Sequence, residues 1–228
     1  MKGKLYGVGI GPGDAKLLTL KAVEVLKEVD VVVIPQSKNE QSTAYNIVKE
    51  HIPTTTEIVG VHTAMSKTHD RNKMYEKAAN TIDELLASNK NVAFITLGDP
   101  TVYSTYMYIH KIIQEKGYNV EIIPGITSFT AAAAALNTSL CEHNEQLHII
   151  PSTYGGYEQH LQLDGNKVLM KNGKELEKVI EYLKTNNDKY KTSIVEKVSM
   201  KDEKIYEDIM DAKDIDSYFT LLIVKERN

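Results

Sequence analysis

A glycine-rich stretch at residues 5–14, Leu-Tyr-Gly-Val-Gly-Ile-Gly-Pro-Gly-Asp, constrains the fold of this chain more than any other segment. Its apolar residues suit a short buried strand, and glycine lets a backbone turn tightly or approach a ligand without a Cβ atom in the way. Counted from Gly7, the sixth position of a dinucleotide fingerprint is Pro12, and counted from Gly9 it is Asp14, although the motif needs glycine there. A phosphate loop also needs Gly-Lys-Ser/Thr, which does not follow. The stretch therefore predicts close approach of the backbone, but not a phosphate site.

A second interpretation of this stretch needs no ligand. An ordinary strand-to-helix turn also uses glycine, and Asp14 or Thr19 would then be the N-cap of the helix that follows. The stretch alone leaves both interpretations open.

Residues 1–124 alternate between strand-like and helix-like segments. Residues 31–34 are apolar throughout and are followed by Pro35, and a strand apolar on both faces is typical of a parallel sheet covered by helices. The periodicity predicts an α/β layer fold. Its expected strands are residues 5–10, 31–34, 57–61, 91–97 and 120–123, and its expected helices are residues 17–29, 43–49, 73–88 and 102–116.

From residue 125 onward the strands follow one another with fewer helices between them, which predicts a mixed, partly antiparallel sheet. The expected strands are residues 146–150, 167–171, 192–197, 203–207 and 218–225, and the expected helices are residues 130–136, 157–162 and 174–186. We therefore predict two α/β domains, residues 1–124 and residues 125–228.

Three loops marked by glycine and proline follow strands of the first domain, at residues 9–14, 97–100 and 124–128. In open α/β sheets ligands bind beyond the carboxyl ends of the strands, so three such loops indicate a ligand site. Asp99 could instead be a helix N-cap, and Thr127 and Ser128 could cap the alanine-rich helix. On the expected helix at residues 102–116, the spacing puts Tyr103 and Tyr106 on one face.

Charge and composition exclude several classes of protein. The net charge of −4 gives no general attraction to nucleic acid, and no apolar run approaches the ~20 residues of a membrane span. The first strand follows the N-terminus directly, which leaves no room for a signal peptide and predicts a cytoplasmic protein. The single cysteine, Cys141, is interpreted as a small buried residue. The histidines lack metal-binding spacing, so no metal site is expected.

Taken together, residues 7–14, residues 97–103 (Leu-Gly-Asp-Pro-Thr-Val-Tyr) and residues 123–128 (Ile-Pro-Gly-Ile-Thr-Ser) resemble the tetrapyrrole methylase family, in that family's order and over nearly the whole chain. The resemblance implies two α/β domains with a cofactor cleft between them, S-adenosylmethionine as the cofactor, a small-molecule tetrapyrrole as the substrate and a homodimer.

Within the family, the stretches at residues 30–37, 103–106 and 124–133 resemble the branch that methylates C20 in corrinoid synthesis. The resemblance favours cobalt-factor II as the substrate, with precorrin-2 next. Another corrinoid-ring methylase, diphthine synthase and a non-catalytic adenosyl-binding protein remain alternatives. Uroporphyrinogen methylases carry a Tyr-Asp pair where this chain has Ile34-Pro35, so no acid/base residue carries over from that branch and the catalytic residue is left unassigned.

The resemblance also nominates site residues. The expected cofactor contacts are Pro12, Leu97, Gly98, Asp99, Val102, Tyr103, Thr127, Ser128, Met170 and Lys171. The loop residues Gly11, Gly13 and Asp14 are expected near the substrate. Basic side chains beside the first-domain loops are expected to meet the carboxylates of the tetrapyrrole, namely Lys38, Lys67, Arg71 and Lys73.

Overall fold

The computed structural model describes residues 2–36, 43–63, 71–215 and 218–227. Two compact units make up the chain, Met1–Thr127 and Ser128–Asn228. Among the described residues, no helix has both the length and the apolar character needed to cross a membrane.

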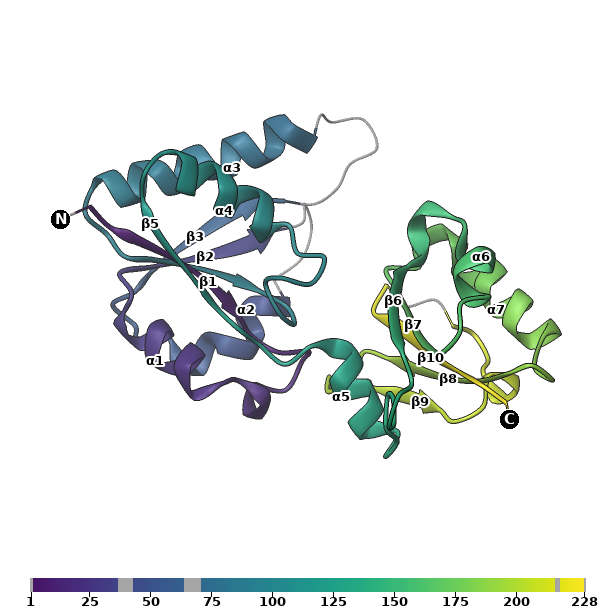
Figure 1. Cartoon of the computed structure of the whole chain (residues 1–228). Helices are drawn as coiled ribbons and strands as arrows, with labels where there is room; N and C mark the ends of the chain where they lie inside the picture. Colours follow the sequence, from purple (N-terminus) through teal and green to yellow (C-terminus); the bar gives the residue numbers. More distant parts are fainter. Residues whose placement is uncertain (1, 37–42, 64–70, 216–217, 228) are drawn as a thin grey trace. The chain divides into compact units, whose positions relative to one another are not determined.

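The first unit is built on a five-stranded sheet with the strand order β3-β2-β4-β1-β5 (Figure 1). All of its pairings are parallel, which confirms the predicted parallel sheet. Strand β1 is an inner strand, between β4 and the edge strand β5, so the glycine-rich stretch at its carboxyl end has a strand end on either side. The strands are β1 (Lys4–Gly9), β2 (Val31–Gln36), β3 (Glu57–His62), β4 (Val92–Thr96) and β5 (Asn119–Ile123).

Helices cover both faces of this sheet (Figure 1). Helices α1 (Leu20–Glu28) and α2 (Thr43–Val48) pack on one face, and α3 (Arg71–Ala87) and α4 (Tyr106–Glu115) pack on the other. Strand β2 explains why both faces are covered. Val32 and Ile34 pack into the hydrophobic cluster under α1 and α2, and Val31 and Val33 pack into the hydrophobic cluster under α3 and α4. An all-apolar strand needs cover on both sides.

Two boundaries near β1 and β2 differ from the prediction. A short 3-10 helix η1 (Ala15–Leu17) precedes α1, and each has its own cap: Asp14 Oδ1 accepts from the Lys16 N–H and Thr19 Oγ1 accepts from the Ala22 N–H. Strand β2 continues through Pro35, which was expected to end it. Proline is tolerated there because β2 pairs with β4 only as far as Val33.

Helix α4 begins at Tyr106, not at residue 102. Residues 97–105 form a loop, in which Tyr103 has the left-handed φ of +48°. The Ser104 hydroxyl accepts from the Tyr106 N–H at 3.2 Å and lies 2.9 Å from Thr96 Oγ1, which fixes the start of the helix. The prediction that Tyr103 and Tyr106 share a helix face is therefore wrong. Tyr106 is fully buried, whereas Tyr103 is exposed.

The second unit carries a mixed sheet with the order β6-β7-β10-β8-β9, in which only β6 and β7 are parallel. This confirms the predicted mixed sheet. Helices α6 and α7 bury Leu161, Val179 and Leu183 against it, and α5 packs against β10. The strands are β6 (Leu147–Pro151), β7 (Asn166–Met170), β8 (Tyr190–Glu196), β9 (Lys204–Tyr206) and β10 (Thr220–Glu226), and the helices are α5 (Ser128–Ala135), α6 (Tyr157–Leu161) and α7 (Leu176–Thr185). Short 3-10 helices complete the chain, at Lys49–His51, Ser152–Tyr154, Gly173–Glu175 and Ile209–Asp211.

Cys141 is exposed, so its interpretation as a buried residue is wrong. It lies in the connection between α5 and β6, outside both elements. A cysteine is buried when the helix or strand that contains it packs against the core. Cys141 lies in a polar stretch outside such an element, so its side chain stays exposed.

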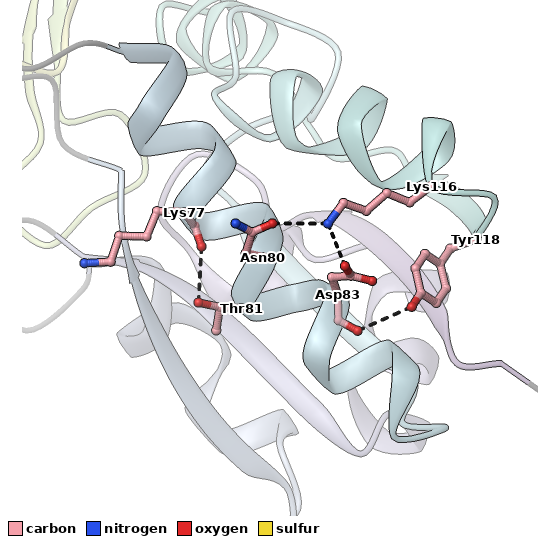
Figure 2. A network of polar contacts seen from close by, with 6 residues as sticks. All are labelled: Lys77, Asn80, Thr81, Asp83, Lys116 and Tyr118. Carbon is pink, nitrogen blue, oxygen red and sulfur yellow. Dashed lines mark hydrogen bonds and ion pairs between the residues drawn. The ribbon is translucent and has the colours of Figure 1, made fainter.

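A polar network joins α3 to the end of α4 (Figure 2). Lys116 Nζ lies 2.6 Å from Asp83 Oδ2 and 3.1 Å from Asn80 Oδ1, and the Tyr118 hydroxyl donates to the Asp83 carbonyl. The hydrogen bond from Lys116 is the main reason that the pKa of Asp83 lies below its usual value. Because both charged side chains are partly exposed, the pair contributes about 1 kcal/mol or less to stability.

Gly7 on β1 makes room for the buried ring of Tyr106. A Cβ atom on Gly7 would lie 2.0 Å from Tyr106 Cε1. The Tyr106 hydroxyl lies 2.9 Å from Nδ1 of His110, which is 9% exposed. Burial lowers the pKa of His110 and raises the pKa of Tyr106, so the folded protein favours the neutral form of both groups.

We expect His110→Leu to destabilise the protein by about 1–3 kcal/mol at pH 8, because the buried Tyr106 hydroxyl loses its partner. The deficit should narrow as the pH falls below about 6.5. The unfolded wild type then takes up a proton on His110 that the folded form resists, so wild-type stability falls while the leucine variant lacks this titration. Urea unfolding between pH 5 and pH 8 measures both effects. His160→Leu, at an exposed histidine, is the control, and a pH-independent deficit in His110→Leu would contradict the assignment.

Candidate functional site

The loops after β1 and β4 are joined by an isolated antiparallel bridge between Gly11 and Gly98. The Gly98 N–H donates to the Gly11 carbonyl at 2.8 Å, and the Gly11 N–H donates to the Gly98 carbonyl at 3.3 Å. Both residues have left-handed backbones, with φ of +73° and +69°. Glycine adopts this conformation without strain, which explains its use at both positions.

The loop after β5 packs directly on the other two. A Cβ atom on Gly125 would lie 2.2 Å from the Gly98 carbonyl oxygen, and one on Gly9 would lie 2.6 Å from the Gly125 nitrogen. The atoms that would be struck belong to backbone, which cannot rotate away. Thr19 Oγ1 adds a long contact of 3.5 Å to the Pro124 carbonyl. The three loops expected at this edge thus form one interlocked unit, called here the three-loop cluster (residues 9–14, 97–100 and 124–125).

Asp99 is the polar centre of the three-loop cluster. Its Oδ1 accepts from the N–H and hydroxyl of Thr101, and its Oδ2 accepts from the Gly125 N–H at 3.0 Å. Burial by itself raises the pKa of the Asp99 carboxyl, but the bonds from Thr101 and Gly125 outweigh it and hold the pKa below its usual value. Asp99 is therefore a carboxylate that orders the loops. Its interpretation as a helix N-cap is wrong, because α4 begins seven residues later at Tyr106.

One part of the cluster is open. The nearest atom to a Cβ placed on Gly98 would be the Ile126 carbonyl oxygen, at 4.0 Å, so the space beside Gly98 is free of described atoms. Pro12 is buried, whereas Leu97, Val102 and Thr127 are partly exposed. A ligand group can therefore reach the backbone at Gly98. The space beside Gly9, by contrast, is filled by the backbone of Gly125 and Gly98.

The structure brings some predicted site residues together within the first unit and places others on different elements. Gly11, Gly98 and Asp99 meet in the three-loop cluster, with Pro12 and Gly13 on the same loop. Asp14 is exposed and caps η1. Arg71 is the exposed first residue of α3, and Lys73 is exposed two residues later. Lys38 and Lys67 lie outside the described residues. Ser128, Met170 and Lys171 belong to the second unit, Ser128 as the first residue of α5 and Met170 as the last of β7.

No cluster of three or more histidine, cysteine or carboxylate side chains that could hold a metal ion occurs in the described part of the chain. The three-loop cluster offers backbone groups and one carboxylate, Asp99, which already accepts hydrogen bonds from Thr101 and Gly125. Such a set suits an organic ligand better than a metal ion, which needs several unoccupied ligand atoms.

The model of the family described as tetrapyrrole (corrin/porphyrin) methylases matches residues 4–213. This chain belongs to the tetrapyrrole methylase family. The predicted family and its two-sheet α/β fold are confirmed. The match spans the three-loop cluster, whose three loops were the basis of the resemblance.

Relatives of this tetrapyrrole methylase include two named for the C20 position. A probable cobalt-precorrin-2 C(20)-methyltransferase of Methanocaldococcus jannaschii is 39% identical over 226 residues, which cover 97% of this chain and 96% of the relative. A precorrin-2 C(20)-methyltransferase of a Sinorhizobium species is 31% identical over 235 residues, which cover 97% of this chain and 95% of the relative.

Solved structures support the fold. A cobalt precorrin-4 methyltransferase superposes with a TM-score of 0.75 and 21% identity, covering 97% of this chain and 94% of that chain. A uroporphyrin-III C-methyltransferase from Thermus thermophilus gives a TM-score of 0.70 and 23% identity, covering 98% of this chain and 92% of that chain. At these identities the likeness extends to the fold alone.

Two features of the site were not predicted from the sequence. The role of Asp99 in joining two loops depends on Gly125, which lies 26 residues away and has no local signal in the sequence. The left-handed Tyr103 was missed because tyrosine rarely adopts that conformation. The Ser104-Thr105 pair in front of an apolar run was the available signal, since these residues favour helix starts.

Proposed function

We propose that this chain is an S-adenosylmethionine-dependent methyltransferase that methylates C20 of a cobalamin-pathway tetrapyrrole, with cobalt-factor II favoured over metal-free precorrin-2. The observation that carries the proposal is the 39% identity, over nearly the full length of both chains, to a relative named for C20 methylation of a cobalt-loaded substrate. The relative named for the metal-free substrate is less similar, at 31% identity.

The three-loop cluster fits an adenosyl cofactor. Its open backbone at Gly98 and the carboxylate of Asp99, which donors from Thr101 and Gly125 hold in place, form a polar surface that is ordered before a ligand binds. In the first unit we propose contacts from Pro12, Leu97, Gly98, Asp99, Val102, Tyr103 and Thr127. In the second unit we propose contacts from Ser128, Met170 and Lys171.

S-adenosylmethionine supplies a methyl group on a positively charged sulfur. Because that charge diminishes in the transition state, the protein contributes chiefly by alignment and by excluding water. The sulfur leaves as a neutral thioether, and the proton on C20 is lost after the methyl group has been transferred. Asp99 does not serve as the base in this proposal, since donors from Thr101 and Gly125 already occupy both of its oxygens. Its part is to hold the loops in one geometry.

For the substrate we propose Gly11, Gly13 and Asp14 as neighbours, and Lys38 and Arg71 as partners of its carboxylates. We also keep three further proposals. Domains at residues 1–124 and 125–228 rest on the change in the pattern of strands and helices, a cytoplasmic location rests on the sequence composition, and a homodimer rests on the family resemblance. The described units Met1–Thr127 and Ser128–Asn228 support the domain proposal.

The decisive assay supplies S-adenosylmethionine with either cobalt-factor II or metal-free precorrin-2 and follows the product by mass spectrometry. We expect a gain of one methyl group, about 14 mass units, on the cobalt form, at a kcat/KM at least roughly tenfold above that for the free form. Gain on the free form alone would reverse the choice of substrate. Gain on neither, with the cofactor still bound, would refute the C20 proposal and favour another family substrate.

A further inference from the structure

Strand β7 ends in a backbone kink. Met170 is its last residue and is buried, and Lys171 then adopts a left-handed φ of +54°. A side chain on a left-handed backbone is strained, and such residues persist only where their surroundings hold them. Met170 and Lys171 are both proposed cofactor contacts, so whatever holds the kink also sets the position of that contact.

Asn172, the next residue, ties the kink to β10. Its side chain is buried, with 2% exposure for the residue, and its Nδ2 donates to the backbone carbonyl of Thr220 at 3.0 Å. Thr220 is the first residue of β10, whose ladder with β7 includes the pair Leu222–Leu169. The Asn172 side chain thus adds a connection between the two strands beyond the point where β7 bends away.

The same kink is also held from outside. Lys171 Nζ lies 5.5 Å from the centroid of the Tyr218 ring, just before β10. The two residues of the kink are therefore attached to one segment, the buried amide of Asn172 to Thr220 and the ammonium of Lys171 to Tyr218. Both attachments fix the direction in which the end of β7 points.

Within the described part of the chain the hydrogen bonding of Asn172 is incomplete, so the side chain contributes less to the stability of the fold than a fully paired one would. Its Oδ1 is buried and has no hydrogen-bond partner among the described residues. A buried acceptor without a partner costs free energy, which offsets the gain from the Nδ2 bond. Removing the side chain deletes both the Nδ2 bond and the buried Oδ1, but it leaves the Thr220 carbonyl without this donor. The loss of global stability should therefore be smaller than for a buried asparagine without an unpaired acceptor, and the effect on local position should remain.

We infer that Asn172 is a positioning residue for the adenosyl cofactor, acting through the Met170–Lys171 end of β7. This inference rests on the proposed function. It assigns to Asn172 no contact with the cofactor itself, because the side chain is committed to Thr220.

Asn166 provides a matched control. It is the first residue of β7, 5% exposed, at the end of the strand opposite the kink. Its Nδ2 donates to the Leu140 carbonyl and to Glu145 Oε2, both at 2.8 Å. Its hydrogen bonds therefore serve the fold at the end remote from the kink.

The experiment compares full-length wild type, Asn172→Ala and Asn166→Ala. Calorimetric titration with S-adenosylmethionine gives Kd, thermal unfolding without ligand gives the midpoint, and steady-state assays give KM and kcat. For Asn172→Ala we expect Kd and the cofactor KM to rise about tenfold, with little change in kcat at saturation and a smaller drop in the midpoint than for Asn166→Ala. For Asn166→Ala we expect a lower midpoint with Kd unchanged.

Equal Kd values for Asn172→Ala and wild type would overturn the inference, as would an equal weakening by Asn166→Ala. If the alanine variant does not fold, the isosteric Asn172→Asp carries the test, because its carboxylate faces the Thr220 carbonyl without a donor. Failure of the proposed function gives a different result. Wild type would then not bind S-adenosylmethionine, or would bind it and methylate neither tetrapyrrole.

Discussion

Gly125→Ala is expected to abolish measurable binding of S-adenosylmethionine, with a loss of affinity of about 100-fold or more. The new methyl group would lie 2.2 Å from the Gly98 carbonyl and 2.9 Å from Gly9 Cα, so the three loops must separate. Separation also breaks the bond from the Gly125 N–H to Asp99. Overpacking of this kind costs about 1–3 kcal/mol, or more when backbone must move, and lowers the thermal midpoint by roughly 4–10 °C.

Calorimetric titration and thermal unfolding of the ligand-free protein measure the two effects separately. Gly117→Ala is the control, because Gly117 has a left-handed φ of +80° and a Cβ atom added there would have nothing within 4 Å. That variant should lose about 1–2 kcal/mol through backbone strain and keep its cofactor affinity. Wild-type affinity in Gly125→Ala would show that the three-loop cluster does not bind the cofactor.

Asp99→Asn is the second large effect that we expect. The substitution keeps the shape but replaces one acceptor oxygen by an NH2 group. If the amide oxygen stays on Thr101, the NH2 faces the Gly125 N–H, and if it turns to Gly125, the NH2 faces two donors of Thr101. Hydrogen bonds to a charged group contribute about 1.5–3 kcal/mol each, so we expect a stability loss of about 2–4 kcal/mol and a cofactor affinity at least tenfold weaker.

Asp83→Asn is the matched control for charge removal in the same unit. Asp83 pairs with Lys116 on the partly exposed surface of α3 (Figure 2), so its loss should cost about 1 kcal/mol or less and leave binding intact. Equal effects of the two substitutions in chemical denaturation and in cofactor titration would refute the central role of Asp99.

The layers of the fold could be predicted from the sequence, because a strand that is buried on both faces has an unbroken run of apolar residues. The unbroken apolar run at residues 31–34 predicted a covered parallel strand, and its residues do alternate between the two core clusters. Ends of elements were less predictable. Pro35 stays in β2 because pairing with β4 has already ended, and that depends on a strand some 60 residues later.

The site was predictable as a set of loops but not as a set of contacts. Glycines at residues 9, 11, 98 and 125 indicated close approach, and the structure shows that much of it is loop against loop. The contribution of Asn172 had no signal at all, since a buried asparagine next to a left-handed lysine is visible only once β10 lies beside β7. Long-range pairing of this kind is set by packing, not by local propensity.

The pairing of β1 with two later strands also has a consequence for synthesis on the ribosome. Leu5 pairs with Val92 on one side and with Val120 on the other. The first strand to be made therefore has no sheet partner until most of the first unit has left the exit tunnel, which takes roughly 6–20 seconds at ordinary translation rates. During that interval the apolar residues of β1 have no strand to cover them, whereas β2 can already pair with β3, and the glycine-rich loop meets its Gly125 neighbour only after β5 has emerged.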